Sequence, residues 1–252
     1  LVSRSGYHAN EPGFILAQLP QRKTVDASGR TLPEMDALRE AWDADYAMRG
    51  RRWARGHCRL PSFHPHERVL DAGCGDGKSL AAIVGERDSP PDSGTRCPEV
   101  VAFDFSREAI RICASRFFGH GCVHLLSADA SRMPYRAGSF DAVLLFHILG
   151  HASVRQRREI CNEVERVIRR GGYVYLRVFS AADFRAGRGE EIEEMTFLRG
   201  DGTFTHYFSL AEVPALFSNL CLISIERVSW TLRVRGEYLP REEIHAVFRA
   251  DS

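Results

Sequence analysis

Short apolar runs and segments of helical spacing alternate along most of this chain. The apolar runs predict strands, and they fall within residues 67–72, 99–104, 123–127 and 142–146. Three segments between or after them have helical spacing, namely 78–86, 107–118 and 153–170. Strands that alternate with helices are typical of crossover connections, and therefore of a parallel sheet with helices on both faces.

The pattern continues beyond residue 170 with longer alternating segments. Residues 170–179 predict a fifth strand, and residues 222–234 and 243–249 predict two more, which makes seven in all. Between them, the charged and glycine-bearing stretch 185–194 predicts a mobile loop. Residues 196–208 predict a hairpin around a Gly-Asp-Gly turn, and Leu210–Leu220 predicts a short helix.

The N-terminal region has a different character. Residues 1–33 mix Pro, Gly and polar residues and predict an irregular arm, whereas residues 33–46 have helical spacing. Leu38, Trp42 and Tyr46 are spaced four residues apart, so we expect them to share one face of this helix.

Composition narrows the classes of protein that remain. The 252 residues are 44% hydrophobic, which is enough to form the core of one large domain. The net charge is +1, so no overall positive field indicates a nucleic-acid partner. No apolar run approaches ~18 residues, so we expect no membrane span. The seven cysteines are scattered without a Cys-x-x-Cys pair, which favours reduced thiols in a cytoplasm over a disulfide framework or a zinc ribbon.

A glycine-rich loop joins the first strand to the first helix of the main domain. Its glycines stand at every second position, as Asp71-x-Gly73-Cys74-Gly75-x-Gly77. A dinucleotide fingerprint requires glycine where Lys78 stands, and a phosphate-binding P-loop requires glycine where Ala72 stands. The loop nevertheless allows a ligand to approach the backbone closely, because glycine has no Cβ.

This loop resembles the first motif of class I S-adenosylmethionine (SAM) methyltransferases. The resemblance implies a doubly wound, seven-stranded Rossmann-like α/β sheet of order 3-2-1-4-5-7-6, with the last strand antiparallel. It also implies SAM as cofactor, with S-adenosylhomocysteine as its product. Residues 61–252 would then form the methyltransferase domain, with a substrate loop and hairpin at 181–208, behind an arm and cap helix at 1–60.

Further residues of the chain match later motifs of this family. Asp104 ends the second strand, where a carboxylate accepts hydrogen bonds from ribose hydroxyls, and Phe105 follows to pack on adenine. Asp129 and Ala130 resemble the third motif, in which a carboxylate binds the adenine amino group. The resemblance implies a cofactor site of Asp71, Gly73, Cys74, Gly75, Gly77, Asp104, Phe105, Asp129, Ala130 and Phe146.

The predicted N-terminal helix carries a second resemblance. Its pattern Trp42-Asp-x-x-Tyr46, followed by Gly50-x-x-Trp53, is similar to a segment that caps the SAM pocket in several small members of the family. The alternative is that these aromatic residues only pack in the core. The arginines between 49 and 59 either form a solvated face or contact an anionic group.

The residue after the fourth strand is the leading candidate for chemistry. His147 could act as a catalytic base, since an imidazole pKa can fall near neutrality, or it could be a structural residue that lines the pocket. His147 and His151, or His120, Cys122 and His124, have the spacing of metal ligands. Neither group has the remaining ligands of a four-ligand site nearby at the usual spacing, so we predict no metal.

The acceptor is indicated only weakly. The sequence after the fourth strand lacks the [Asp/Asn]-Pro-Pro-[Tyr/Phe] motif of nucleic-acid amino methylases, and no cysteine has the context of a cytosine-C5 nucleophile. Residues 147–158 resemble the corresponding segment of tRNA wobble-uridine carboxymethyl methylases. We therefore expect a SAM-dependent methyltransferase that modifies an oxygen, nitrogen or sulfur atom, with tRNA as the leading substrate. The alternatives are a small molecule, a protein side chain, or a SAM-binding subunit without activity; a small activator subunit is a candidate partner.

Overall fold

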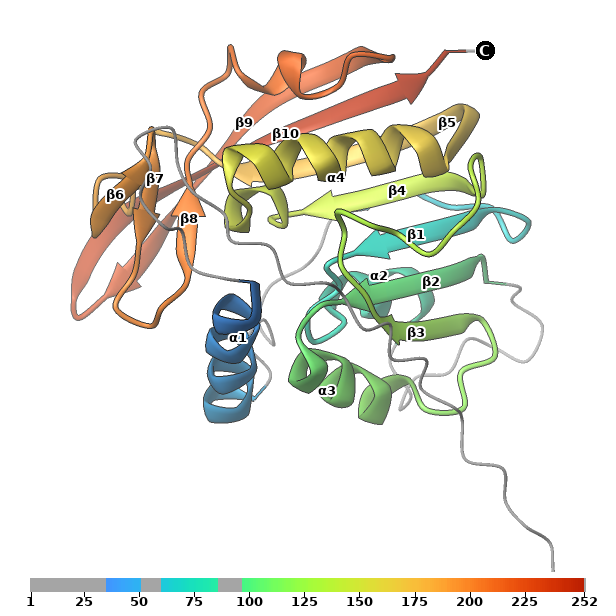
Figure 1. Cartoon of the computed structure of the whole chain (residues 1–252), viewed down its shortest axis with the longest axis horizontal. Helices are drawn as coiled ribbons and strands as arrows, with labels where there is room; N and C mark the ends of the chain where they lie inside the picture. The colour runs from blue at the N-terminus through green and yellow to red at the C-terminus, as the bar shows by residue number, and fades with distance from the viewer. Residues whose placement is uncertain (1–34, 51–59, 86–96, 252) are drawn as a thin grey trace, which may run out of the picture.

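Seven strands form one sheet in the order β3-β2-β1-β4-β5-β10-β9 (Figure 1). The computed structural model describes residues 35–50, 60–85 and 97–251. The strands are β1 (Arg68–Ala72), β2 (Glu99–Asp104), β3 (Val123–Ser127), β4 (Phe140–Phe146), β5 (Ile168–Phe179), β9 (Leu220–Val234) and β10 (Glu237–Ala250). The first five are parallel, and β10 runs antiparallel to both β5 and β9. The expected strand order and the antiparallel last strand are therefore confirmed.

Helices cover both faces of the sheet because its central strands alternate between two cores. Val69 of β1 packs with α2 (Lys78–Val84) and α3 (Arg107–Phe117) on one face. Leu70 packs on the other face with α4 (Val154–Val167), near the 3₁₀ helix η2 (Val213–Leu216). Buried strands of this kind read as continuously apolar, which is why the sequence identifies them well.

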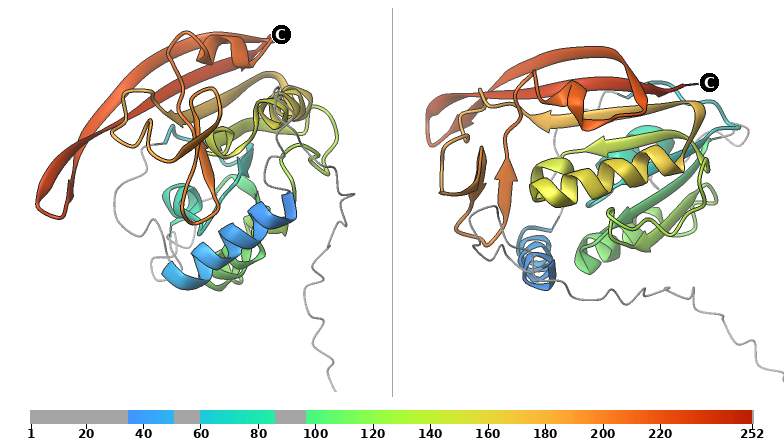
Figure 2. Two further views of the ribbon diagram at one scale, coloured as in Figure 1. Left: turned by 60° about the vertical axis from the view of Figure 1, so that its left-hand side comes forward. Right: turned by 45° about the horizontal axis from the view of Figure 1, so that its top comes forward.

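The C-terminal half adds structure at one side of the sheet. The β9–β10 hairpin is the longest in the described residues and extends past the helical layers, as both views in Figure 2 show. A small antiparallel sheet of β6 (Glu190–Glu193), β7 (Thr196–Leu198) and β8 (Phe204–His206) lies beside it. The helix α1 (Met35–Arg49) packs against α3, and η1 (Leu149–His151) packs against β8.

Tertiary pairing changes several expected boundaries. The expected mobile loop at 185–194 contains β6, because Glu190 and Glu191 pair with β7. The expected helix at 210–220 is reduced to η2, since Leu220 pairs with Ala250 in the β9–β10 ladder. The helix expected to reach residue 170 ends at Val167, because Ile168 already pairs with Phe140 of β4.

The cysteine prediction is wrong for one pair. Cys97 and Cys122 form a disulfide, while Cys74, Cys113, Cys161 and Cys221 are free. Sequence spacing hides this pair, because the pairing of Val100 with Val123 brings the two preceding segments together only in the folded sheet.

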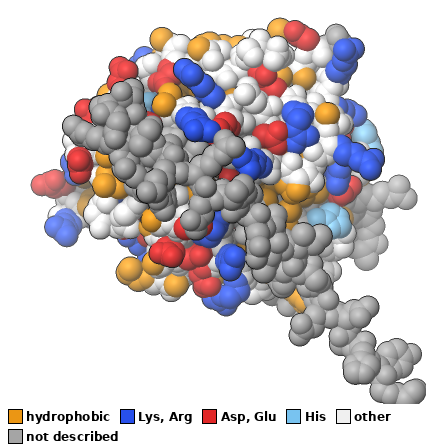
Figure 3. Space-filling model, in the orientation of Figure 1, with side chains coloured by type: hydrophobic (Ala, Val, Ile, Leu, Met, Phe, Trp, Pro, Cys, Tyr) orange, Lys and Arg blue, Asp and Glu red, His pale blue; other side chains and the backbone are white. Residues whose placement is uncertain are grey.

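Two further observations concern membrane spans and surface charge. Among the described residues, no helix is long and apolar enough to cross a membrane. Figure 3 shows Lys and Arg side chains interspersed with Asp and Glu side chains over one face of the molecule. The net charge of +1 is thus distributed without a single-sign field on that face.

Candidate active site

A cavity of about 1280 Å³ opens at the carboxyl ends of the parallel strands, bounded by α1 and by the β9–β10 hairpin. Its size suits a nucleotide-sized cofactor together with part of a second molecule. The predicted site residues that line it are Trp42, Tyr46, Gly73, Cys74, Gly75, Asp104, Phe105, Asp129, Ala130, Phe146 and His147. Asp71 and Gly77 do not line it, and Trp53 lies outside the described residues.

The glycine loop is held against the end of β2 by backbone hydrogen bonds. Gly73 and Cys74 both donate to the carbonyl oxygen of Phe103, at 2.8 and 2.9 Å. Gly75 has a φ of +54°, and a Cβ there would lie 2.6 Å from the hydroxyl oxygen of Tyr46. Gly77 instead faces α3, where a Cβ would lie 2.5 Å from a ring carbon of Phe117. Gly75 therefore keeps the cavity wall open, whereas Gly77 permits helix packing.

Asp104 is a buried carboxylate at the cavity wall. Its Oδ2 accepts a hydrogen bond from the Gly75 amide at 3.0 Å, and its Oδ1 accepts one from the Ser106 amide at 2.9 Å. Burial raises its pKa to about 6, although the hydrogen bonds from Ser106 and Gly75 partly oppose this rise. Carboxylate oxygens can accept further bonds, so a ligand in the cavity can still be bound here.

Asp71 lies beneath the loop and not at the cavity surface. It is 1% exposed, and burial followed by the charge of Asp104 raises its pKa to about 7. Its Oδ2 has no hydrogen-bond partner among the described residues. Direct cofactor contact by Asp71 is thus not supported by the cavity lining.

The helix α1 contributes both to a hydrophobic core and to the cavity wall. Leu38, Trp42 and Tyr46 are buried against Ala109 and Phe204, so they belong to a hydrophobic core. The same three side chains line the cavity. Asp43 fixes the helix in place: its Oδ1 accepts hydrogen bonds from the Ser106 hydroxyl at 2.6 Å and from the Glu108 amide at 3.1 Å.

The segment after β3 forms another part of the wall. Asp129 is half-buried, and its Oδ1 accepts a hydrogen bond from the Ser131 amide at 2.8 Å. Ala130 is buried beside it, and Phe105 comes from the end of β2. The arrangement places a carboxylate, a small residue and an aromatic ring around one end of the cavity.

His147 occupies the cavity wall between β4 and β10. Its Nε2 lies 3.3 Å from one carboxylate oxygen of Glu243, and the Nε2 of His245 lies 2.8 Å from the other. The His147 ring stacks on Phe179 with 4.5 Å between ring centres. Burial lowers the pKa of His147 to about 4, despite the opposing effect of Glu243. The expectation of titration near neutrality is therefore wrong, and this imidazole is neutral at pH 7.

Arginines and aromatic rings form the wall beyond His147. The guanidinium of Arg241 lies over Phe179 at 4.4 Å and Trp230 at 5.5 Å, and it pairs with the buried Asp183. Burial, followed by the charges of Arg241 and Arg199, lowers the pKa of Arg185. Arg185 and Arg241 both line the cavity, so this wall is positively charged.

Sequence reasoning missed the contribution of β10 to this wall. Arg241, Glu243 and His245 stand at every second position, so they share one face of the strand. The signal was present as a polar period of two within a predicted strand. No family motif marks it, and only the folded sheet places this face beside His147.

Comparison with known proteins identifies the central domain. The methyltransferase domain family matches residues 70–176, which is less than half of the chain. These residues form a SAM-dependent methyltransferase domain, and SAM is the cofactor of such domains.

Several relatives of this methyltransferase have curated names. The tRNA N(3)-cytidine methyltransferase METTL2 of Gallus gallus is 27% identical over 67% of this chain and 46% of its own length. METTL2B of Homo sapiens is 27% identical over 67% and 45%. The tRNA (carboxymethyluridine(34)-5-O)-methyltransferase of Arabidopsis thaliana is 32% identical over 52% and 28%. The chain spans about half the length of the METTL2 relatives that it matches.

Solved structures share the methyltransferase fold. A SAM-dependent methyltransferase from Methanosarcina mazei superposes with a TM-score of 0.59 at 22% identity, over 75% of this chain and 95% of its own. A methyltransferase solved with the Trm112 activator of Haloferax volcanii gives 0.60 at 19% identity, over 85% and 98%. At these identities the likeness establishes the fold alone.

The cavity of this methyltransferase fits SAM on its own chemistry. A ribose requires hydrogen-bond acceptors, which Asp104 offers at the wall. A cation benefits from aromatic faces, and Trp42, Tyr46 and Phe146 line the same cavity. The open backbone at Gly75 gives a ligand access that a side chain would block.

Proposed function

We propose that this methyltransferase transfers a methyl group from SAM to a pyrimidine nucleoside of tRNA. The relatives from Gallus gallus, Homo sapiens and Arabidopsis thaliana are named for cytidine or uridine derivatives in tRNA, which supports this substrate class. The observation that carries the proposal is the wall formed by β5, β9 and β10. A nucleotide in RNA combines a flat base with a phosphodiester anion, and this wall offers Phe179, Trp230 and Arg241 to such a group.

The cofactor half of the cavity has these roles in the proposal. Asp104 accepts hydrogen bonds from the ribose hydroxyls of SAM, and Gly73, Cys74 and Gly75 border its methionine part. Phe105 packs on the adenine, with Asp129 as the acceptor for the adenine amino group and Ala130 beside it. Trp42 and Tyr46 cover the ligand from α1.

The acceptor half supplies orientation. SAM contributes a methyl group that its sulfonium has already activated, so alignment and exclusion of water provide most of the catalysis. His147 is neutral at pH 7 because burial lowers its pKa to about 4. It can therefore form one hydrogen bond with the substrate that receives the methyl group, either as donor or as acceptor. Glu243 lies between His147 and His245, so it restrains the imidazole in one orientation.

This assignment agrees with the chemistry of both acceptors named among the relatives. N3 of cytidine has a lone pair without a proton, and the carboxylate of carboxymethyluridine likewise attacks without losing one. Neither reaction requires a strong base. We therefore assign His147 to positioning of the acceptor, in place of proton abstraction at neutral pH.

The test is incubation of the whole chain with methyl-labelled SAM and separate tRNA, protein and metabolite fractions. We expect label in tRNA, and nucleoside analysis should locate it on a pyrimidine. Label in the protein or metabolite fraction alone would exclude the tRNA substrate while leaving methyl transfer intact. Binding of SAM without label in any fraction would instead support a SAM-binding subunit without activity.

A matched pair of variants tests the acceptor wall. Arg241→Gln, made together with Asp183→Asn so that no buried carboxylate loses its partner, should raise the KM for tRNA about tenfold or more while the affinity for SAM stays unchanged. The reason is that a charge-assisted contact is worth about 1.5–3 kcal/mol. Arg249→Gln is the control, since Arg249 lies on the same strand, against Tyr173, and does not line the cavity. Equal KM values for the two variants would show that Arg241 does not contact the tRNA.

We further propose a small activator subunit and a cytoplasmic location. The solved complex with Trm112 supports the first, and a tRNA substrate supports the second. Adding a Trm112-type protein from the same organism should raise the labelling of tRNA at constant enzyme concentration. Full labelling by the chain alone, with no gain on addition, would exclude the activator.

A further inference from the structure

Three side chains that could bind a metal meet far from the cavity, at the amino ends of β2 and β3. Cys97 precedes β2, Cys122 precedes β3, and His120 lies in the turn after α3. One potential ligand atom from each lies within 4.8 Å of the other two. None of the three residues lines the cavity, so this cluster is separate from the methyl-transfer site.

The backbone holds these residues in place. The Val100 amide donates to the carbonyl oxygen of Cys122 at 2.8 Å, and the Val123 amide donates to that of His120 at 3.1 Å. The His120 amide donates in turn to the Phe117 carbonyl at 3.0 Å. Strand pairing and the end of α3 thus organise the cluster, and it does not depend on the disulfide alone.

The ring of His120 supplies an independent indication of a missing partner. Its Nδ1 is buried and has no hydrogen-bond partner among the described residues. Buried polar atoms in native proteins are nearly always satisfied. His120 is therefore poorly accommodated beside a disulfide, whose sulfur atoms are weak acceptors.

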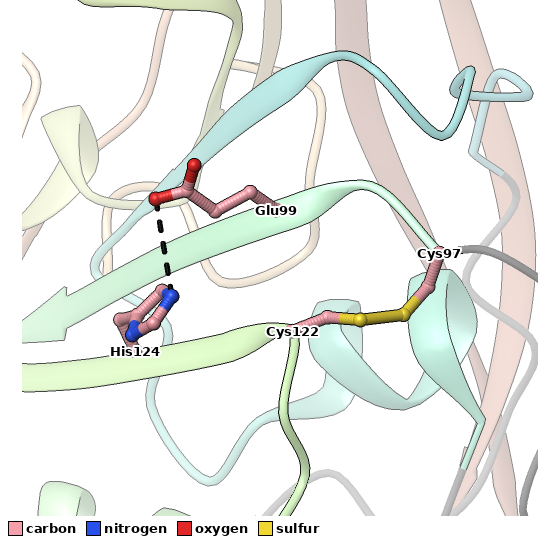
Figure 4. Close-up of a disulfide and its surroundings, with 4 residues drawn as sticks. All are labelled: Cys97, Glu99, Cys122 and His124. Carbon is pink, nitrogen blue, oxygen red and sulfur yellow. Dashed lines mark ion pairs between the residues drawn. A yellow bond between two sulfur atoms is a disulfide. The ribbon is translucent and has the colours of Figure 1, made fainter.

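His124, which sequence spacing grouped with His120 and Cys122, does not belong to the cluster. Its side chain is 57% exposed and its Nε2 lies 3.8 Å from the Glu99 carboxylate. Figure 4 shows His124 directed toward Glu99, with the disulfide between Cys97 and Cys122 at the strand ends. The third ligand that the sequence lacked is Cys97, which is supplied by strand pairing.

We propose that the reduced protein binds Zn²⁺ or a similar thiophilic divalent metal through Cys97, Cys122 and His120, and that disulfide formation releases it. Two thiolates and one imidazole are soft and borderline ligands that suit Zn²⁺, with water in the fourth position. Sulfur ligands at about 2.3 Å in tetrahedral geometry lie about 3.7 Å apart. The two sulfur atoms therefore have to separate on reduction, and the Cα atoms of Cys97 and Cys122, which are 6.5 Å apart, leave room for this.

Reduction of the Cys97–Cys122 disulfide requires an electron donor, for which a dithiol suffices. Two electrons from the dithiol reduce the Cys97–Cys122 disulfide to two thiols, and the dithiol becomes a cyclic disulfide. Metal binding then displaces one proton from each thiol. In the reverse direction a disulfide oxidant accepts two electrons from the thiolates, and the metal leaves.

Metal binding by this cluster would stabilise the edge of the sheet formed by β2 and β3. The cluster joins β2 to β3 at the ends opposite Asp104 and Asp129, so the metal and the disulfide are alternative cross-links of the same two strands. We expect the metal to raise the melting temperature of the reduced protein and to leave its affinity for SAM within about twofold.

The experiment is anaerobic titration of the reduced chain with Co²⁺ and Zn²⁺. We expect one metal per chain, a thiolate-to-Co²⁺ charge-transfer band that Zn²⁺ removes, and no binding after oxidation to the disulfide. His120→Asn should weaken the affinity at least tenfold, and Cys97→Ser should abolish the band. His124→Asn and Cys221→Ser are controls that should bind metal as the parent does.

His120→Asn remains interpretable only if it folds. The control is oxidation of this variant. If it folds, Cys97 and Cys122 form their disulfide, and mass spectrometry detects the loss of two hydrogen atoms. A folded His120→Asn that binds metal with the parent affinity would overturn the proposal. So would a reduced parent that binds no metal, or a Cys97→Ser variant that keeps the charge-transfer band.

Discussion

Asp104 offers the sharpest test of the cofactor site through the substitution Asp104→Asn. The carboxylate is 8% exposed, and its pKa rises from an ordinary value of 3.8 to about 6. This rise corresponds to about 3 kcal/mol by which the folded environment, burial partly opposed by hydrogen bonds, disfavours the charged form in the ligand-free protein. An amide at the same position removes that penalty.

The amide also loses an acceptor. Asp104 accepts hydrogen bonds from the amides of Gly75 and Ser106 through different oxygen atoms, and Asn has only one oxygen to offer. An unsatisfied buried donor costs about 1–3 kcal/mol. The gain and the loss nearly cancel, so we expect the melting temperature at pH 7.5 to change by only a few degrees.

The affinity for SAM should respond quite differently. The ribose hydroxyls lose a charged acceptor, and each such hydrogen bond is worth about 1.5–3 kcal/mol. Isothermal titration should therefore give a Kd at least tenfold higher for Asp104→Asn. In the parent the affinity should rise with pH through about 6 as Asp104 ionises, whereas the variant should show no such rise.

A carboxylate on the same strand gives the control. Glu99 begins β2 at its other end, is exposed and pairs with Arg68, so Glu99→Gln should leave the affinity for SAM unchanged. If Asp104→Asn binds SAM as tightly as Glu99→Gln does, Asp104 does not contact the ribose. A collapse of the melting temperature without ligand would refute the balance of burial and hydrogen bonding described above.

Three further predictions concern other parts of the cavity. His147→Asn should lower kcat/KM for the acceptor with SAM affinity intact. At saturating SAM the pH–rate profile of the parent should stay flat from pH 6 to 8, because the pKa of His147 is about 4; an acidic limb near pH 6.5 under saturating SAM would contradict this. Gly75→Ala should weaken SAM binding at least tenfold in titration, because its φ is +54° and the new Cβ would lie 2.6 Å from the Tyr46 hydroxyl; rescue by Tyr46→Phe would confirm that collision as the cause. Asp71 has a folded pKa of about 7, above its ordinary value, so stability is lost as pH rises from about 4 through 7. Asp71→Asn should flatten this dependence in urea titrations and stabilise the protein at pH 8. A urea midpoint at pH 8 lower than that of the parent would refute this prediction.

The sequence by itself determined the sheet and the cofactor edge. Central parallel strands are buried on both faces, so runs such as Ala142–Phe146 are apolar throughout and are recognised locally. Asp104 ends one strand and the glycine loop follows another, and the carboxyl ends of parallel strands meet at one edge. Local pattern and local connection therefore suffice to place them together.

Tertiary structure alone decided the cavity wall beside His147 and the cysteine pairing. Arg241, Glu243 and His245 come from an antiparallel strand almost a hundred residues after His147, and no local pattern specifies the strand beside which they pair. Cys97 and Cys122 are 25 residues apart, and only the register of β2 with β3 makes them neighbours. The pKa of His147 likewise depends on burial, which is a property of the packed cavity and not of the residue or its neighbours in sequence.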